Sequence, residues 1–352
     1  MSGNVKKRKK RSVIMPEKKS QKRILLIATG GTIATRMTKD GLVPQMTSQE
    51  ILACIPEIAS ICEVDTIQLF NLDSTNICHM QWIQVVSCIQ DHYAQYEGFV
   101  VTHGTDTMAY TAAALSYMIQ ESPKPIVITG SQKSIYMKET DGRVNLLNAF
   151  YYAISSYASG VHIVFDGKAI LGTRARKTRT KSYNAFSSID YPETARIRDG
   201  RVIPIAEENY SDRIPKFYLK LNPNVFVFKL IPGISADIFS FLKNSYDAVI
   251  IESFGVGGIP SYGKQKKDFF KAIGDWIQSG KILIMATQVP HEGSDMEVYQ
   301  VGYTIKEKYE LIESYDMTLE AVVAKTMWIL GQTADRQQFR TMFYQPVQRD
   351  IL

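Results

Sequence analysis

Short apolar runs alternate along the chain with longer segments in which apolar residues recur every three to four positions. Five runs in the first half have the length of strands: residues 24–29, 64–70, 99–102, 126–129 and 161–165. Helical spacing fills three of the intervals, at residues 80–93, 107–119 and 144–157. A further helix starts at Thr47, which forms a capping-box sequence with Glu50, and runs to Ile55. The alternation predicts an α/β fold built on a mostly parallel sheet flanked by helices.

The pattern breaks between residues 190 and 223, where charged residues and prolines replace the apolar runs. Strand-like runs then resume at residues 225–230, 248–252, 281–286 and 309–313, and two amphipathic segments follow at 319–330 and 335–343. The chain is long enough for two hydrophobic cores. We therefore expect an amino-terminal α/β catalytic domain over residues 23–205, a linker over 206–222 and a smaller carboxyl-terminal α/β domain over 223–352.

The basic charge is concentrated at the amino terminus. The first 23 residues carry ten lysines and arginines against one glutamate, a net charge of +9. Because the whole chain has a net charge of +6, the remaining residues carry about −3. We expect residues 1–22 to be a disordered, solvated arm and do not expect nucleic acid as a partner. No run approaches the roughly 18 apolar residues of a membrane span, and the first apolar run is too short for a signal peptide. These features predict a cytoplasmic protein without a membrane partner.

The four cysteines do not form a metal site or a redox pair. Cys54, Cys62, Cys78 and Cys88 lie in one segment with no Cys-x-x-Cys pair and no histidines at zinc-finger spacing. We interpret them as reduced packing residues and expect no metal.

Candidate chemistry begins directly after the first predicted strand, at Gly30-Gly31-Thr32. Two glycines let the backbone bend and approach a ligand, and they leave Thr32 exposed at the strand end. The loop lacks the third glycine and the following acid of a dinucleotide site, so we expect no cofactor. Taken alone, a tight turn with a capping threonine explains the motif better than catalysis does.

Two further polar segments follow predicted strands. Residues 103–107, His-Gly-Thr-Asp-Thr, come just before a helix, whose amino-terminal end favours anionic groups. Asp106 there is either a helix cap or the partner of an ammonium group, with the Thr105 hydroxyl beside it. Residues 71–76 are short and polar, suited to receiving a carboxylate, although turn formation explains them equally well.

A basic cluster occupies residues 172–181. Its default interpretation is a solvated face, but one lysine held against a pocket could serve as a base.

Segments 29–33 and 103–107 together are similar to the paired signature of the asparaginase family, in particular its type I, cytoplasmic bacterial branch. The resemblance continues over nearly all of the chain after the arm, through residues 73–76, 129–132, 174–186, 232–235 and 316–321. It implies a large amino-terminal and a smaller carboxyl-terminal α/β domain. It also implies self-association as a dimer or tetramer, with active sites near a subunit interface.

The resemblance implies catalytic roles residue by residue. Thr32 matches the nucleophile of the first signature, and the family's Thr-Asp-Lys constellation corresponds to Thr105, Asp106 and Lys177. Lys177 is preferred to Lys181 because it lies nine residues before Phe186, in the stretch where the family lysine sits. His103 is expected to orient its loop rather than to act as a base.

The substrate contacts implied by the resemblance lie in the same loops. Ser74, helped by Asp73 and Thr75, is expected to receive the α-carboxylate of L-asparagine. Asp106 is expected to hold the α-ammonium group. The two glycines expected to line the pocket are Gly31 and Gly104.

These roles imply an L-asparaginase, which hydrolyses L-asparagine to L-aspartate and ammonia. The threonine hydroxyl forms an aspartyl ester of Thr32, which water activated through Thr105 and Lys177 then cleaves. A weak glutaminase activity is expected as well, because a pocket discriminates one methylene by only about 1 to 3 kcal/mol.

Two other functions remain open. One is a non-catalytic amino-acid sensor, although such a sensor has no need of Lys177. The other is the amidase subunit of a glutamyl-tRNA amidotransferase, which normally has an additional amino-terminal domain that the basic arm is too short to form.

The chain also departs from the family pattern in two loops. Leu42 replaces a tyrosine that many members carry two residues before the proline, here Pro44, so the group that activates Thr32 is left open. Lys133-Ser134 replaces a hydrophobic residue followed by proline, a change expected to alter loop shape without affecting the chemistry.

Overall fold

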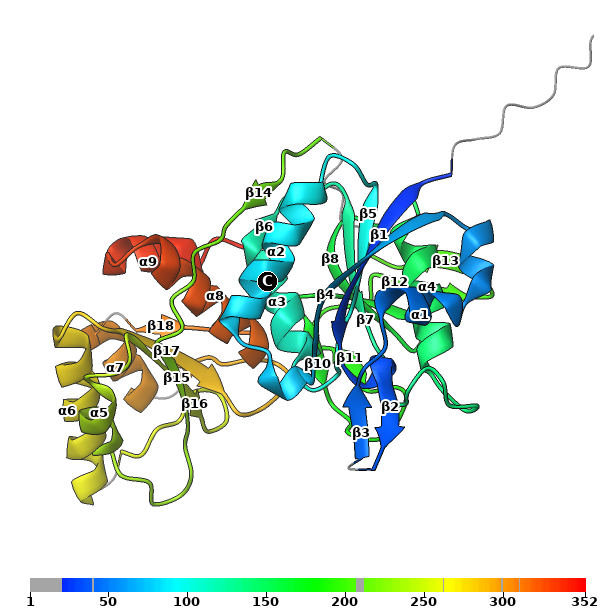
Figure 1. Ribbon diagram of the computed structural model, residues 1–352. Helices are drawn as coiled ribbons and strands as arrows, with labels where there is room; N and C mark the ends of the chain where they lie inside the picture. Colours follow the sequence, from blue (N-terminus) through cyan, green and yellow to red (C-terminus); the bar gives the residue numbers. More distant parts are fainter. Residues whose placement is uncertain (1–20, 40, 207–211, 262, 299, 310) are drawn as a thin grey trace, which may run out of the picture.

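The computed structural model describes residues 21–39, 41–206, 212–261, 263–298, 300–309 and 311–352. Of the arm predicted to be disordered, residues 1–22, this set includes only Gln21 and Lys22, and the Lys22 carbonyl accepts from the Glu63 N–H at 3.0 Å. The chain forms two α/β domains, as expected, and the larger one contains the amino-terminal half (Figure 1).

An eight-stranded sheet in the order β13-β12-β9-β8-β7-β5-β1-β4 forms the centre of the larger domain. Five neighbouring strands are parallel: β4 (Glu63–Leu72), β1 (Arg23–Gly30), β5 (Gly98–Thr102), β7 (Pro125–Thr129) and β8 (Gly160–Phe165). Three antiparallel strands extend the sheet beyond β8: β9 (Lys168–Leu171), β12 (Ala195–Arg198) and β13 (Arg201–Pro204). The carboxyl ends of the parallel strands therefore meet at one edge, where ligands bind in such sheets.

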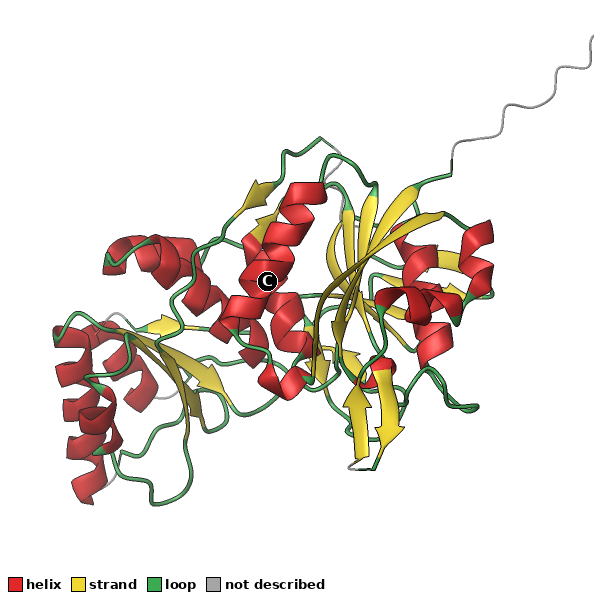
Figure 2. Ribbon diagram, viewed as in Figure 1, coloured by secondary structure: helices red, strands yellow, loops and turns green. Residues whose placement is uncertain are grey.

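Helices cover both faces of this sheet, as Figure 2 shows. The side chains of β1 alternate between two cores: Ile24, Leu26 and Ala28 face one, and Leu25 and Ile27 face the other. The first core is closed by α1 (Ser48–Ala53), α4 (Gly142–Ala153) and the 3₁₀ turn η2 (Pro56–Ser60). The second is closed by α2 (His79–His92) and α3 (Met108–Met118). A strand that is apolar on both faces is thus buried on both, which fixes β1 inside the domain.

Shorter elements form the loops around the edge where the parallel strands end. Two hairpins lie there, β2 (Thr35–Thr38) with β3 (Gly41–Pro44) and β10 (Ala175–Lys177) with β11 (Phe186–Ser188). The 3₁₀ turns η1 (Thr32–Ala34) and η3 (Ser74–Asn76) follow β1 and β4. A separate short ladder joins β6 (Ile119–Gln120) to β14 (Lys216–Phe217).

The smaller domain has a four-stranded parallel sheet: β15 (Val225–Lys229), β16 (Ala248–Ser253), β17 (Ile282–Thr287) and β18 (Ile312–Glu313). One face packs in a core with α5 (Ile238–Leu242), α6 (Gly263–Gln278) and α7 (Gln300–Tyr309). The other face packs against α8 (Leu319–Gln332), which is followed by α9 (Arg336–Phe343).

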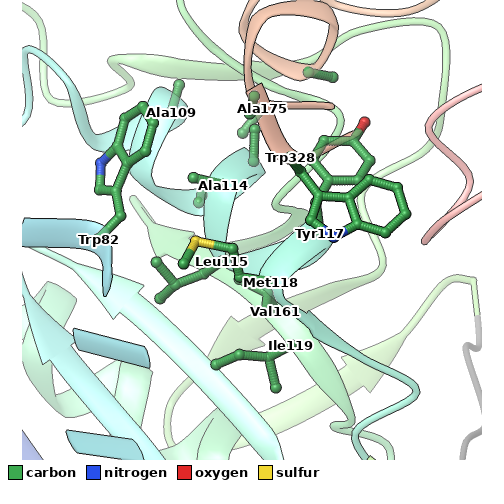
Figure 3. Close-up of a cluster of buried hydrophobic side chains, with 14 of the residues drawn as sticks. Trp82, Ala109, Ala114, Leu115, Tyr117, Met118, Ile119, Val161, Ala175 and Trp328 are labelled. Atoms are coloured by element: carbon green, nitrogen blue, oxygen red, sulfur yellow. The ribbon is translucent and has the colours of Figure 1, made fainter. Parts of the chain in front are cut away.

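Helix α8 also packs along α3 (Figure 1). One continuous core of buried side chains therefore spans both domains. Figure 3 shows the centre of this contact, where Trp328 of α8 lies beside Tyr117 of α3. The two rings stack with centroids 6.0 Å apart. Because burial of large aromatic side chains stabilises a contact strongly, the two domains are firmly joined through α3.

A buried ion pair reinforces the same contact. Lys325 and Asp350 have fully buried side chains, and Lys325 Nζ lies 2.6 Å from Asp350 Oδ2. The Tyr117 hydroxyl donates to the same carboxylate oxygen at 2.9 Å, and Lys325 also donates to the Gln345 carbonyl. Asp350 therefore holds the carboxyl-terminal segment against both α3 and α8.

Several sequence expectations were wrong in detail. Residues 190–223 contain the hairpin of β12 and β13, and the predicted helix 144–157 ends at Ala153. The predicted strand 309–313 is reduced to β18, because Tyr309 ends α7. All four cysteines are free thiols, but Cys78 is exposed and caps α2 rather than packing in a core. The domain and linker boundaries stay a prediction.

Within the described part of the chain, no helix is long and apolar enough to cross a bilayer.

Buried His162 makes stability depend on pH. Burial lowers the pKa of His162 to about 4. Between pH 6.5 and 4 the unfolded chain therefore binds a proton that the folded chain does not, and stability falls as the pH falls, by on the order of 3 kcal/mol. We expect His162→Phe, which keeps the ring contact with Tyr152, to lose part of this dependence in urea unfolding at pH 7.5 and 4.5. His79→Gln, at a half-buried position in α2, is the control. An unchanged pH dependence in His162→Phe would contradict the assignment.

Removing only one partner of the Lys325–Asp350 pair should lower the stability of the protein strongly. Asp350→Asn leaves the Lys325 ammonium buried without its counter-ion, so we expect the free energy of unfolding to fall by about 3 to 5 kcal/mol. The double variant Lys325→Met/Asp350→Asn removes the buried charge and should recover part of the loss. Urea unfolding at pH 7.5 measures both. A loss below about 1 kcal/mol in Asp350→Asn would show that water or another group compensates the lysine.

Candidate active site

The end of β1 lies against the ends of both neighbouring strands. Gly30 and Gly31 have φ angles of +103° and +77°, a region that favours glycine. A Cβ on Gly31 would lie 2.3 Å from the backbone nitrogen of Gly104, and one on Gly30 would lie 2.5 Å from the backbone of Leu72. Only glycine fits at either position. Thr32 follows this contact at the start of η1 and is half-buried.

The loops after β5 and β4 are packed equally closely. A Cβ on Gly104 would lie 2.6 Å from Ser74 Oγ, and Ser74 is buried. The Thr107 hydroxyl, at the start of α3, donates to the Ser74 carbonyl at 2.8 Å. Because Gly104 contacts both Gly31 and Ser74, the residues that follow it lie next to the other two strand ends.

Asp73 and Thr75 are both exposed and interact within their own turn. The Thr75 backbone N–H and hydroxyl donate to Asp73 Oδ1 at 2.8 and 2.7 Å. Turn formation therefore accounts for both side chains, and their expected contact with substrate stays a prediction.

The β10–β11 hairpin places Lys177 against the loop after β5. Lys177 pairs with Phe186 across the hairpin. Its Nζ lies 2.8 Å from Thr105 Oγ1 and 2.6 Å from Asp106 Oδ1. The lysine side chain is 15% exposed, whereas that of Asp106 is 59% exposed. The three groups form one hydrogen-bonded unit that opens to solvent at the carboxylate. Lys181 lies exposed in the loop between the two strands.

His103 is a buried structural group. Trp82 Nε1 donates to Thr111 Oγ1 at 3.0 Å, which contacts His103 Nε2 at 2.9 Å, and His103 Nδ1 lies 2.7 Å from the Gly104 carbonyl. A neutral ring with its proton on Nδ1 satisfies every contact. Burial lowers the pKa of His103 to about 4, so the ring stays neutral near pH 7. These contacts orient the loop that carries Thr105, as expected for His103.

The loop after β7 completes the row of strand ends and was assigned no role from the sequence. Gln132 Oε1 accepts a long hydrogen bond from the Thr105 hydroxyl, at 3.4 Å. The adjacent Ser134 hydroxyl donates to the Thr35 carbonyl at 2.6 Å, and the Ile135 N–H donates to the Ile33 carbonyl. The departure at Lys133-Ser134 thus ties this loop to the turn that carries Thr32. The rule that functional residues follow parallel strands would have pointed to Gln132.

The turn after Thr32 is held by its own backbone. Ala34 N–H donates to the Gly31 carbonyl at 3.0 Å, and the Thr35 hydroxyl donates to the Thr32 carbonyl at 2.8 Å. Leu42 follows in β3 and pairs with Met37. The side chain of Leu42 lies outside the described part.

The interpretation of residues 172–181 as a solvated face was wrong for Arg174. Its side chain is fully buried, and its guanidinium contacts the Asp316 carboxylate and carbonyl at 2.8 and 2.9 Å. Burial of the charge is possible because these acceptors replace water. Arg174 thus fastens the segment that leads into β10 to the smaller domain.

In the part of the chain that the structure describes, no group of three or more His, Cys, Asp or Glu side chains is placed to hold a metal ion. The site instead offers a threonine at the end of β1 and a Thr-Lys-Asp unit beside it. A hydroxyl nucleophile with a neighbouring proton-transfer unit is an arrangement suited to acyl transfer.

Two family models match the chain. Residues 23–209 match "Asparaginase, N-terminal", and residues 224–343 match "Glutaminase/Asparaginase C-terminal domain".

Similar proteins are found along nearly the whole chain. An L-asparaginase of Thermococcus kodakarensis is 33% identical over 94% of this chain and 99% of the relative, and L-asparaginase 1 of Escherichia coli is 32% identical over 94% and 98%. One subunit of the glutamyl-tRNA(Gln) amidotransferase of Pyrococcus furiosus is 32% identical over 91% of this chain and 74% of its own length. The solved structure of the Thermococcus asparaginase superimposes with a TM-score of 0.87 at 32% identity, over 94% of this chain and 99% of that one. This chain therefore belongs to the L-asparaginase family.

Proposed function

We propose that the protein is an L-asparaginase that hydrolyses L-asparagine to L-aspartate and ammonia with Thr32 as nucleophile. The observation that carries the proposal is the contact of Lys177 Nζ with Thr105 Oγ1 and Asp106 Oδ1, at 2.8 and 2.6 Å. The Gly31–Gly104 contact, which sets this unit beside Thr32, supports it. The similarity to two L-asparaginases over almost their full length supports the substrate.

The reaction proceeds through an ester. Thr32 Oγ bonds to the side-chain carbonyl carbon, the C–N bond breaks, and the leaving nitrogen takes the proton given up by the hydroxyl and departs as ammonia. Water then adds to the ester carbon, the C–O bond to Thr32 breaks, and a proton from the water restores the hydroxyl. The unit of Thr105, Lys177 and Asp106 moves the proton in the water step.

Substrate recognition follows the charges of the site. Asp106, with its exposed carboxylate, takes the α-ammonium group. The Ser74 hydroxyl, next to the amino-terminal end of α3, receives the α-carboxylate because a helix amino terminus favours an anion. Asp73 and Thr75, in the same turn, help Ser74 to receive the carboxylate, and the bare backbones of Gly31 and Gly104 line the pocket.

The branch of the family, the oligomeric state and the cellular location are proposed from similarity alone. Similarity to L-asparaginase 1 of Escherichia coli supports the type I branch. The family resemblance supports self-association as a dimer or tetramer and a cytoplasmic location.

The nucleophile is tested by threonine removal. We expect Thr32→Ala and Thr105→Ala each to lower kcat for ammonia release from asparagine by about a thousandfold or more, since each removes a group that bonds to or exchanges a proton with the reacting atoms. Thr178→Ala is the matched control: it lies next to Lys177, but its hydroxyl contacts Ser187 and Arg179 at the surface. Near-normal turnover in Thr32→Ala would refute the nucleophile assignment.

Assays of the purified wild-type protein separate the alternative functions. Release of ammonia from free asparagine without a partner subunit supports an asparaginase. Calorimetric binding of asparagine without ammonia release would indicate the amino-acid sensor. Ammonia transfer only in the presence of glutamyl-tRNA and a partner subunit would indicate the amidotransferase.

Substrate preference follows from the length of the amide side chain. Glutamine is one methylene longer than asparagine, a difference worth about 1 to 3 kcal/mol, or roughly 10- to 200-fold in kcat/KM. We expect measurable glutaminase activity within that range below the asparaginase activity. Ammonia release measured for both amides over the same concentrations decides it, and equal or reversed kcat/KM values would contradict the preference.

A further inference from the structure

The backbone of Gln132 is fixed beside Thr105 by the start of α4. Its N–H donates to both oxygens of Asp141, at 3.1 and 2.8 Å, and the following Lys133 N–H donates to the same carboxylate. Asp141 is buried and also accepts from the Asn145 amide. Three contacts from this segment to one carboxylate, which Asn145 also holds, fix the backbone, so the Gln132 side chain leaves it from a defined point.

The orientation of the Gln132 amide is set by two carbonyl groups. Nε2 lies 3.2 Å from the Thr180 carbonyl and 3.1 Å from the Ser182 carbonyl, both in the β10–β11 loop. A flipped amide would place Oε1 against two oxygens that have no proton to donate, so the NH₂ group must face the loop. Oε1 therefore faces Thr105 and acts there only as an acceptor.

This acceptor determines the direction of the Thr105 proton. Lys177 Nζ donates to Thr105 Oγ1 at 2.8 Å, so the hydroxyl proton must point elsewhere, and Gln132 Oε1 at 3.4 Å accepts it. The first contact is short and the second is long. The hydroxyl can thus leave Gln132 at small cost and turn its proton to Lys177 when that amine becomes an acceptor.

We propose that Gln132 is a positioning residue that holds the Thr105 side chain in the rotamer needed for the reaction. In this rotamer the hydroxyl oxygen directs a lone pair toward Lys177 and its proton toward Gln132. Gln132 exchanges no proton itself and acts through Thr105. The inference rests on the proposed function for its kinetic meaning, and on the amide contacts for its geometry. It also links the β10–β11 loop, which carries both carbonyls, to the hydroxyl of Thr105.

Two substitutions separate the two ends of the amide. Gln132→Met keeps the length of the side chain and removes both the acceptor and the donors. Gln132→Glu keeps an acceptor toward Thr105 and removes the donors to the loop. We expect kcat for asparagine to fall about tenfold in Gln132→Met with KM changed less than twofold, as for loss of one hydrogen bond in the reacting unit. We expect Gln132→Glu to keep more of the wild-type kcat than Gln132→Met does.

A matched control disturbs the same loop at another point. Tyr183→Phe removes the hydrogen bond from the Tyr183 hydroxyl to the Glu139 carbonyl and should keep the wild-type kcat and KM. Wild-type kcat in Gln132→Met would overturn the proposal. A kcat in Gln132→Glu at or below that of Gln132→Met would also overturn it, because repulsion of the carboxylate by the two carbonyls would then show that the loop tether is what matters.

A structural measurement keeps the inference separate from the proposed function. If the wild-type protein releases no ammonia, the function fails, and crystal structures of the wild type and Gln132→Met still decide the inference. A second Thr105 rotamer or a lengthened Thr105–Lys177 contact in the variant would support it. An unchanged Thr105 would overturn it.

Discussion

The close contact of two bare backbones, Gly31 against Gly104, is the constraint on which the site depends. Neighbouring strands in a sheet lie about 4.8 Å apart, and the loops that leave β1 and β5 come closer still. Gly130 repeats the arrangement one strand further along, because a Cβ there would lie 2.2 Å from the His103 carbonyl. Glycine at these close contacts brings successive strand ends together. Each functional side chain is then placed near the others because it directly follows one of these strand ends.

Most of the larger domain follows from its apolar runs. Strands buried on both faces have near-continuous apolar sequences, and β1, β5, β7 and β8 are of this kind. The hairpin of β12 and β13 has a weaker signal. In β12 the buried Ala195 and Ile197 alternate with exposed arginines over only four residues. An antiparallel strand near the sheet edge, with one solvated face, is therefore hard to tell from a charged loop.

The site was predictable to the extent that it lies in loops directly after strands. Thr32, Ser74 and Thr105 are found at such positions. Lys177 lies in a hairpin, and its contact with Thr105 joins residues 72 apart in the chain. Only the resemblance to a family singled it out among its basic neighbours. Gln132 also follows a parallel strand, β7, but its contact with Thr105 joins residues 27 apart in the chain, and the sequence does not show which side chain of that loop reaches Thr105.

None of the proposed catalytic residues lies in the smaller domain, yet that domain takes part in positioning them. Arg174 is three residues before Lys177 and is locked to Asp316 by a buried guanidinium–carboxylate contact. The strand that carries Lys177 is therefore anchored in the smaller domain, whereas Thr105, which Lys177 contacts, belongs to the larger domain. The smaller domain thus supports the position of Lys177. Substitutions near Asp316 are therefore expected to alter the proposed reaction through Lys177, without contacting the substrate.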